Sequence, residues 1–144
     1  MSAAAQGRPH QTKIPSAARA FWITGPGRSE IRSEPIPRPT GGALLVRANH
    51  GAISKGTETL VYRGMVPPST AARMRCPFQV GEFPGPVKYG YSTVGEVIGG
   101  PDDWIGRSVF CLYPHQDFFT IPVAAAYLLP KGVPPARAVL AANM

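Results

Sequence analysis

Acidic residues are scarce in this chain. Eight aspartates and glutamates stand against fifteen lysines and arginines among its 144 residues, so the formal net charge is +7 at pH 7. The basic residues form no consecutive run and do not alternate with aromatics. Because nucleic-acid binding usually needs a clustered basic stripe or a recognised motif, we expect no nucleic-acid partner. A solvated basic surface explains the charge, as does a surface that faces an anionic dinucleotide or another part of the protein.

Cysteine is scarce too, with only Cys76 and Cys111 in the chain. Neither lies in a Cys-x-x-Cys pair, which excludes a cysteine-rich zinc site. The chain does not look like a small secreted domain held together by disulfides. We therefore expect two buried thiols in a reducing cytoplasm, with a disulfide between them as the alternative.

Long hydrophobic runs are also missing. No stretch reaches the roughly 18 apolar residues of a membrane span, so we expect no membrane association. The first residues, MSAAAQGRPHQTKIPS, lack the hydrophobic core of a secretory signal. We interpret residues 1–16 as a flexible N-terminal tail, and a weak similarity to an organelle transit peptide is the alternative.

Glycine and proline, in contrast, are abundant, with 16 and 17 residues. They show no period, which excludes collagen, and they fall between short apolar runs, as in a β-rich domain with many turns. We expect strands in ARAFWITG, SEIRSEPIP, ALLVRANHGAIS, VKYGYSTVGEVIG, RSVFCLYP and DFFTIP, and a short extended piece in AAAYLLP. A short helix is expected between Ser54 and Gly64, with Ser54 or Thr57 as its N-cap, and another after Ser69.

The last eleven residues predict the beginning of a helix. Pro134 and Pro135 suit a helix start, and ARAVLAANM follows with helix-forming residues and an apolar side. The predicted helix has no cap and is short enough to be marginal by itself in water. We therefore expect it to continue beyond Met144.

The order of these segments resembles the N-terminal, GroES-like domain of the medium-chain dehydrogenase/reductase superfamily, which includes zinc alcohol dehydrogenases and zinc-free quinone reductases. The resemblance is carried by ARAFWITGPG, ALLVRANHGAIS, GYSTVGEV, IGRSVF and LLPKGVPPARAVLA, in the family's order. GYSTVGEV stands where the family has Gly-His-Glu-x-x-Gly. The stretch GAISKGTETLVYRGMVPP is similar to a zinc-ligand-poor branch near the bacteriochlorophyllide dehydrogenases.

The resemblance implies a mainly β fold, a GroES-like, partly open β-barrel with short helices that ends in a truncated crossover helix. Residues 17–133 would form the catalytic or substrate domain, and residues 134–144 would begin the crossover into a missing Rossmann domain. The glycine-rich loop that would hold a dinucleotide pyrophosphate is absent from the chain. The resemblance thus implies NAD or NADP bound mainly by the missing domain, and a homodimer when the protein is full length.

The resemblance also places hydroxyl side chains in the catalytic site. Ser54 stands at the family's first zinc-ligating cysteine, Tyr91 at its zinc-ligating histidine and Ser92 at the acid that follows. Hydroxyls are poor zinc ligands because their protons would leave at a cost of several pK units, so we expect no catalytic zinc. Ser54, Thr57 or Tyr91 would instead polarise a carbonyl or move a proton. Alternatively, Tyr91 packs in a strand while Ser54 and Thr57 cap a helix.

Other polar residues near these positions are candidates for cofactor contact or for local pairing. In some family members a basic residue at the position of Lys55 contacts the cofactor pyrophosphate, and a solvated lysine is the alternative. Glu58 would pair locally with Lys55 or Arg63, or orient the loop. His50 and His115 have no second ligand at metal spacing, so we expect surface or structural histidines.

These expectations combine into a functional hypothesis. The chain would be the substrate-side domain of a zinc-independent NAD(P)-dependent oxidoreductase for a small-molecule alcohol, carbonyl or alkene, inactive without its cofactor domain. The alternative is a free-standing GroES-like binding module without catalysis, against which the uncapped final helix argues.

Overall fold

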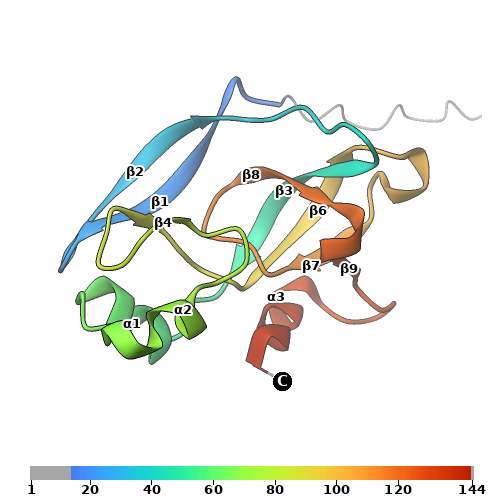
Figure 1. The fold of residues 1–144 in the computed structure, drawn as a ribbon. Helices are drawn as coiled ribbons and strands as arrows, with labels where there is room; N and C mark the ends of the chain where they lie inside the picture. The colour runs from blue at the N-terminus through green and yellow to red at the C-terminus, as the bar shows by residue number, and fades with distance from the viewer. Residues whose placement is uncertain (1–13, 144) are drawn as a thin grey trace, which may run out of the picture.

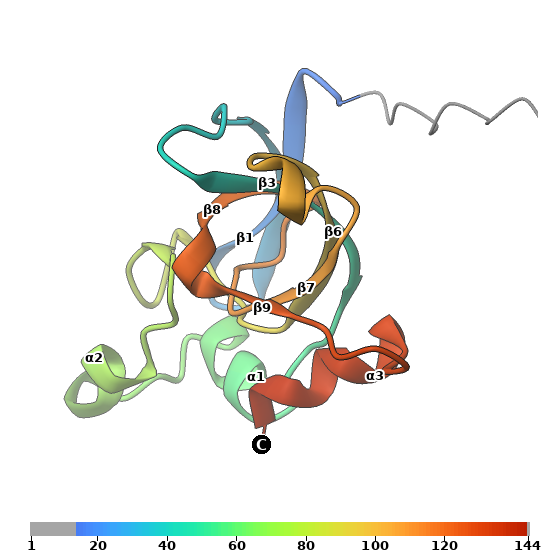
Figure 2. The same ribbon diagram turned by 90° about the vertical axis from the view of Figure 1, so that its right-hand side faces the viewer.

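Two antiparallel sheets build the fold, and three short helices lie at one end of it (Figures 1 and 2). A computed structural model describes residues 14–143, so most of the predicted tail 1–16 lies outside the described residues. The first sheet has the strand order β2-β1-β5-β4 and the second has the order β8-β3-β6-β7-β9. The strands are β1 (Ala17–Gly25), β2 (Arg28–Pro35), β3 (Ala43–Gly51), β4 (Val80–Gly81), β5 (Val87–Lys88), β6 (Thr93–Gly99), β7 (Ser108–Cys111), β8 (Phe118–Pro122) and β9 (Ala126–Leu128).

The helices are all short. They are α1 (Thr57–Tyr62), α2 (Ala71–Met74) and α3 (Pro135–Ala138), with 3₁₀ turns at Pro68–Thr70, Asp102–Trp104, Val123–Ala125 and Val139–Asn143. Within residues 14–143 no helix has the length and apolar character needed to cross a membrane. The mainly β architecture with short helices agrees with the sequence prediction.

The five-stranded sheet curls around the main core, and Figure 2 looks into the ring that its strands form with β1. Alternate side chains of its strands point inward, which is the period-2 pattern of a half-buried strand. The buried residues of this core are Leu44, Val46, Val97, Val109, Cys111, Phe119, Ile121 and Ala126. Each large side chain buried in this way contributes about 1.5–3 kcal/mol, so this core is the main source of the sheet's stability.

The stretch VKYGYSTVGEV is not the single bent strand that the sequence predicts. Its first part forms β5, which pairs with β1 and β4, while its last part forms β6, which pairs with β3 and β7. The chain therefore changes sheets between Lys88 and Thr93. Gly90 lies at this change with a φ of +123°, a conformation that side chains strongly disfavour. A Cβ atom at Gly90 would also lie 2.7 Å from Cδ2 of His115.

Helix α1 begins without the side-chain cap that the sequence predicts. Its N-cap residue is Gly56, and no side chain caps the helix, so capping by Ser54 or Thr57 is wrong. The carboxylate of Glu58 accepts a hydrogen bond of 3.0 Å from the backbone N–H of Ser54 instead. Gly64 follows the helix with a φ of +66°, as predicted for its end.

The C-terminal segment packs on the outer face of the five-stranded sheet. Helix α3 begins at Pro135, as the proline pair predicts, and turns into a 3₁₀ helix at Val139. Val139 is buried in a cluster with Val94 and Phe110. The Ser92 hydroxyl, just before β6, donates a hydrogen bond to the Val139 carbonyl, so the link between β5 and β6 helps to hold this segment in place. Its continuation beyond Met144 stays a prediction.

Both cysteines are buried and unpaired, so the alternative of a disulfide between them is wrong. Cys111 lies in the core of the five-stranded sheet, and Cys76 lies in a second core beneath the first sheet. Burial raises the pKa of Cys76 to about 11 and that of Cys111 to about 12. Burial also raises the pKa of Tyr113 to about 12.

These buried groups predict a loss of stability at high pH. Cys111 has an ordinary pKa of 9.0, so above pH 9 the unfolded chain releases this proton before the folded chain does. The free energy of unfolding therefore falls as the pH rises from 9 towards 12, by up to about 1.4 kcal/mol per pH unit for each such group. Urea unfolding between pH 7 and pH 11 measures this fall. Cys111→Ala should make the fall shallower, whereas a free energy of unfolding that is constant up to pH 11 would contradict the prediction.

Gly90→Ala should destabilise the fold by about 2–4 kcal/mol, because it combines a strained φ with a clash against His115. Gly106→Ala is the matched control, since Gly106 has a φ of +77° but no atom within 4 Å of the added Cβ. The control should cost only the conformational strain of about 1–2 kcal/mol. Urea unfolding compares the two variants, and equal losses would show that the contact with His115 carries no energy.

Candidate functional site

Three segments meet at the end of the barrel that carries the helices (Figure 1). They are the loop after β3, the link between β5 and β6, and the loop between β7 and β8. The backbone N–H of Ala52 donates a hydrogen bond of 3.0 Å to the Ser92 carbonyl, and that of His115 donates one of 3.2 Å to the Tyr89 carbonyl. These bonds fix the three segments relative to one another.

The residues predicted from the sequence lie on two of these segments. Ser54 and Thr57 are half-buried at the start of α1, and Lys55 between them is exposed. Tyr91 is half-buried on the link between β5 and β6, where its ring lies edge-on to that of Tyr89 at a centroid distance of 6.1 Å. Their catalytic and cofactor-binding roles stay predictions.

A Glu58–His115 pair joins these segments, and sequence reasoning did not find it. Oε2 of Glu58 lies 2.6 Å from Nε2 of His115, and the two side chains are only 10% and 18% exposed. Glu58 thus pairs with a residue 57 positions away rather than with Lys55 or Arg63, as its local sequence suggested. In the sequence, the one sign that Glu58 belongs to the site was its position directly after the candidate residue Thr57.

His115 is held firmly through its backbone and its neighbour in sequence. Its carbonyl accepts a hydrogen bond of 2.9 Å from the Phe21 N–H, and its own N–H is bound to Tyr89. The next residue, Gln116, accepts a hydrogen bond of 2.7 Å from Nζ of Lys88. The imidazole therefore sits on a loop with little freedom to move, which is the arrangement that a preorganised site needs.

The ammonium of Lys88 is itself buried, and its charge is compensated. Nζ of Lys88 lies 2.6 Å from Oε2 of Glu34, whose other oxygen accepts a hydrogen bond from the Trp22 indole. The guanidinium of Arg32 lies 4.4 Å from the centre of the Trp22 ring. Since breaking a buried pair leaves an unpaired charge at high cost, this network anchors Gln116 to the first sheet.

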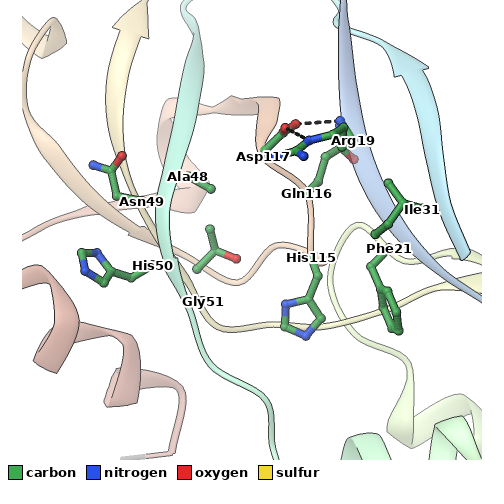
Figure 3. Close-up of a pocket in the computed structure, with 11 residues that line it drawn as sticks. Arg19, Phe21, Ile31, Ala48, Asn49, His50, Gly51, His115, Gln116 and Asp117 are labelled. Atoms are coloured by element: carbon green, nitrogen blue, oxygen red, sulfur yellow. Dashed lines mark hydrogen bonds and ion pairs between the residues drawn. The ribbon is translucent and has the colours of Figure 1, made fainter. Parts of the chain in front are cut away.

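Two cavities share His115 and Phe21 in their walls. The first, of about 420 Å³, lies between β1 and β3 (Figure 3). In Figure 3 the His115 ring lies between Gly51 and Phe21, and the ion pair of Arg19 with Asp117, 3.0 Å long, lies at the rim. The second, of about 370 Å³, lies beside α1. His115 thus borders both spaces and Glu58 borders the second, whereas Ser54, Thr57 and Tyr91 are not among the lining residues of either.

A catalytic zinc does not fit the residues at the family's ligand positions. Such a zinc needs three protein ligands with nitrogen, sulfur or carboxylate donors, whereas Ser54 and Tyr91 offer hydroxyls. Across residues 14–143 no three histidine, cysteine, aspartate or glutamate side chains lie together as a metal-binding group. Zinc independence stays a prediction.

No protein-family model matches the sequence. One curated relative, the 2-desacetyl-2-hydroxyethyl bacteriochlorophyllide A dehydrogenase of Cereibacter sphaeroides, is 31% identical over 87 residues. The match covers 58% of this chain and 23% of that relative. The similarity therefore concerns only part of the relative.

Solved dehydrogenase structures share the fold. A Sinorhizobium meliloti 1021 protein assigned to the alcohol dehydrogenases matches with a TM-score of 0.64 and 18% identity, over 88% of this chain and 44% of that one. A short chain alcohol dehydrogenase of Escherichia coli CFT073 in complex with NADH matches with a TM-score of 0.63 and 16% identity, over 88% and 42%. A zinc-binding dehydrogenase of Sinorhizobium meliloti 1021 bound to NADP matches with a TM-score of 0.59 and 16% identity, over 88% and 42%.

This chain spans less than half the length of each of these proteins. The shared part is the two-sheet barrel with its short helices, which agrees with the fold that the sequence motifs implied. The chain therefore has the GroES-like fold that it shares with these dehydrogenases over the matched part.

Proposed function

We propose that this chain is the substrate-side domain of a zinc-independent NAD(P)-dependent oxidoreductase, which transfers a hydride at an alcohol, a carbonyl or an alkene. The proposal is supported by the GroES-like fold together with the hydroxyls of Ser54 and Tyr91, at the positions that the sequence resemblance assigns to the family's metal ligands. The nicotinamide cofactors in two of the fold neighbours support hydride chemistry.

In this proposal a nicotinamide supplies or accepts the hydride, while the chain positions the substrate. Ser54, Thr57 and Tyr91 donate hydrogen bonds to the substrate oxygen, where negative charge develops. Lys55, which is exposed just before α1, contacts the cofactor pyrophosphate. A Rossmann domain outside this chain binds the rest of the cofactor.

The substrate in this proposal is a small molecule with an apolar body. The aromatic and aliphatic side chains of Phe21 and Ile31 line the larger cavity, and Ile23 and Ile53 line the smaller one. The curated relative is named for a hydroxyethyl compound. 1-Phenylethanol, a hydroxyethyl group on an aromatic ring, is therefore a suitable first probe, with acetophenone as its ketone.

The cellular setting belongs to the same proposal. The free, buried thiols of Cys76 and Cys111 support a reducing compartment, so we place the protein in the cytoplasm. We also propose that the full-length protein is a homodimer.

The proposal predicts metal-independent turnover. The natural full-length protein that contains this chain should oxidise 1-phenylethanol or related secondary alcohols with NAD⁺ or NADP⁺, followed at 340 nm. Because Ser54 and Tyr91 do not suit zinc, dialysis against 1,10-phenanthroline should leave the rate unchanged, and metal analysis should find no stoichiometric zinc. A rate lost to the chelator and restored by zinc would contradict zinc independence.

The isolated 144-residue chain is the control and should show no turnover. Turnover by this chain alone would contradict the need for a further domain. A full-length protein that neither binds nor reduces a nicotinamide would favour the binding module.

Lys55→Ala should raise the KM for the nicotinamide cofactor about tenfold while changing kcat little, because a hydrogen bond to a charged group contributes about 1.5–3 kcal/mol. Lys131→Ala is the matched control, since Lys131 is an exposed lysine in the turn before α3. Steady-state kinetics at varied cofactor concentration measure the effect. Equal KM values for both variants would show that Lys55 is merely solvated.

A further inference from the structure

We propose that His115, oriented by Glu58, exchanges the proton of the substrate oxygen in this site. The proposal rests on the function proposed above, because it assigns the proton step of that hydride transfer. Neither residue is among the hydroxyls that the family resemblance indicated.

Glu58 determines which nitrogen of the imidazole carries the hydrogen. An ionised carboxylate only accepts hydrogen bonds, so at 2.6 Å from Oε2 the Nε2 atom of His115 must donate. The other oxygen of Glu58 accepts the Ser54 N–H at 3.0 Å. With both oxygens engaged, the carboxylate is fixed, and the neutral ring keeps its lone pair on Nδ1.

Nδ1 of His115 lies on the side of the ring near Gly51, which lines the larger cavity together with His115. It accepts no hydrogen bond from any residue of the described range 14–143. A Cβ atom added at Gly51 would lie 3.7 Å from Nδ1, in ordinary van der Waals contact with it. Figure 3 shows the ring between Gly51 and Phe21 at the wall of that cavity. A bound hydroxyl could therefore reach Nδ1 without displacing another partner.

The other charged groups near the cavity are already paired or exposed. Asp117 accepts hydrogen bonds from both the backbone N–H and the guanidinium of Arg19, and His50 on β3 is exposed. Glu58 is thus the carboxylate bonded to the ring of His115 within the described residues. Its charge balances the imidazolium that forms when Nδ1 takes a proton, which is the role of the third group in a nucleophile–base–carboxylate arrangement.

In the oxidative direction His115 acts as a general base. Nδ1 takes the proton of the substrate hydroxyl, and the electrons of the broken O–H bond form the C=O bond. The carbinol carbon gives up its hydride to the oxidised nicotinamide, which the proposed function supplies. The products are a carbonyl compound, the reduced nicotinamide and an imidazolium, which returns its proton to solvent. In the reductive direction His115 donates the proton to the oxygen.

The apolar side chains of the larger cavity define the substrate class. Phe21 and Ile31 line the cavity on the side of the first sheet. An apolar body fits against them while its hydroxyl or carbonyl points to His115. We therefore assign the cavity to secondary alcohols and ketones with an aromatic or aliphatic body.

If the Glu58–His115 pair were only structural, it would hold α1 against the loop after β7. The variant His115→Gln distinguishes this structural role from proton transfer. The amide nitrogen of glutamine can replace Nε2 as the donor to Glu58, so the tie is kept. Glutamine does not titrate, so it cannot take up a proton. Glu58→Gln tests the partner, because it keeps an acceptor but removes the charge. His10→Gln controls for the loss of a histidine elsewhere in the chain.

The experiment measures kcat and KM for 1-phenylethanol across pH 5–9 in the natural full-length protein and in H115Q, E58Q and H10Q. General acid–base catalysis contributes about 10²–10⁴-fold, so H115Q should lower kcat about 100-fold or more. The decline in rate at acid pH, where a histidine base becomes protonated, should disappear in H115Q. E58Q should lower kcat by a smaller factor, and H10Q should match the native protein. The Tm of H115Q and its KM for the cofactor should stay unchanged.

Other results would overturn the assignment. If H115Q keeps kcat within threefold and retains the acid decline, His115 is structural, while the proposed function stands. A native protein without any nicotinamide-dependent turnover refutes the proposed function, and the proton step falls with it. Long-range ¹H–¹⁵N spectra of the histidine-labelled native protein provide a test without substrate. They should show hydrogen on Nε2 of neutral His115, and hydrogen on Nδ1 would overturn the proposal.

Discussion

The short chain segment from His115 to Asp117 joins the two sheets, and the candidate site depends on it. The Phe21 N–H of the first sheet donates to the His115 carbonyl at 2.9 Å, while the Ala48 N–H of the second sheet donates to the Asp117 carbonyl at 2.8 Å. The Asp117 N–H in turn donates to the Arg19 carbonyl at 3.1 Å. Because this segment is bonded to both sheets, the position of the imidazole is a consequence of how the sheets pack. The side chain can therefore be precise although it lies in a loop.

A buried charge supports the same segment. Lys88 would be costly to bury alone, and Glu34 and Gln116 together compensate its ammonium through contacts of 2.6 and 2.7 Å. Removing one partner would leave the others buried and unpaired, which costs more than the pair itself contributes. The network thus favours a single arrangement of β5 against the loop. Gly90 follows β5 closely, and its bare Cα leaves room for the His115 ring. Packing, charge compensation and site geometry are coupled at this point of the fold.

Local features of the sequence predicted most of the elements but not their partners. Alternating apolar residues and the turn at Gly27 gave the first strands, and the prolines gave the beginning of α3. The division of VKYGYSTVGEV between two sheets could not be predicted, because both halves are rich in β-formers and only pairing with distant strands separates them. The site shows the same limit. Ser54 and Tyr91 are predicted as site residues from local motifs, whereas the Glu58–His115 pair spans 57 positions and depends on the loop's tertiary placement.

Under the proposed function, a site without suitable metal ligands would need another group to handle the substrate's proton. A metal ion polarises a substrate oxygen without taking up a proton itself. Serine and tyrosine hydroxyls can donate hydrogen bonds to that oxygen, but their high intrinsic pKa values in general keep them protonated at neutral pH, so they do not take up its proton. Oxidation of an alcohol still releases a proton, which some group must accept. Histidine changes charge in the physiological range, and a neighbouring carboxylate stabilises its protonated form. In the proposed zinc-independent enzyme, hydroxyls at the metal-ligand positions would leave this proton without an acceptor, and the carboxylate-bound imidazole of His115 would take that role.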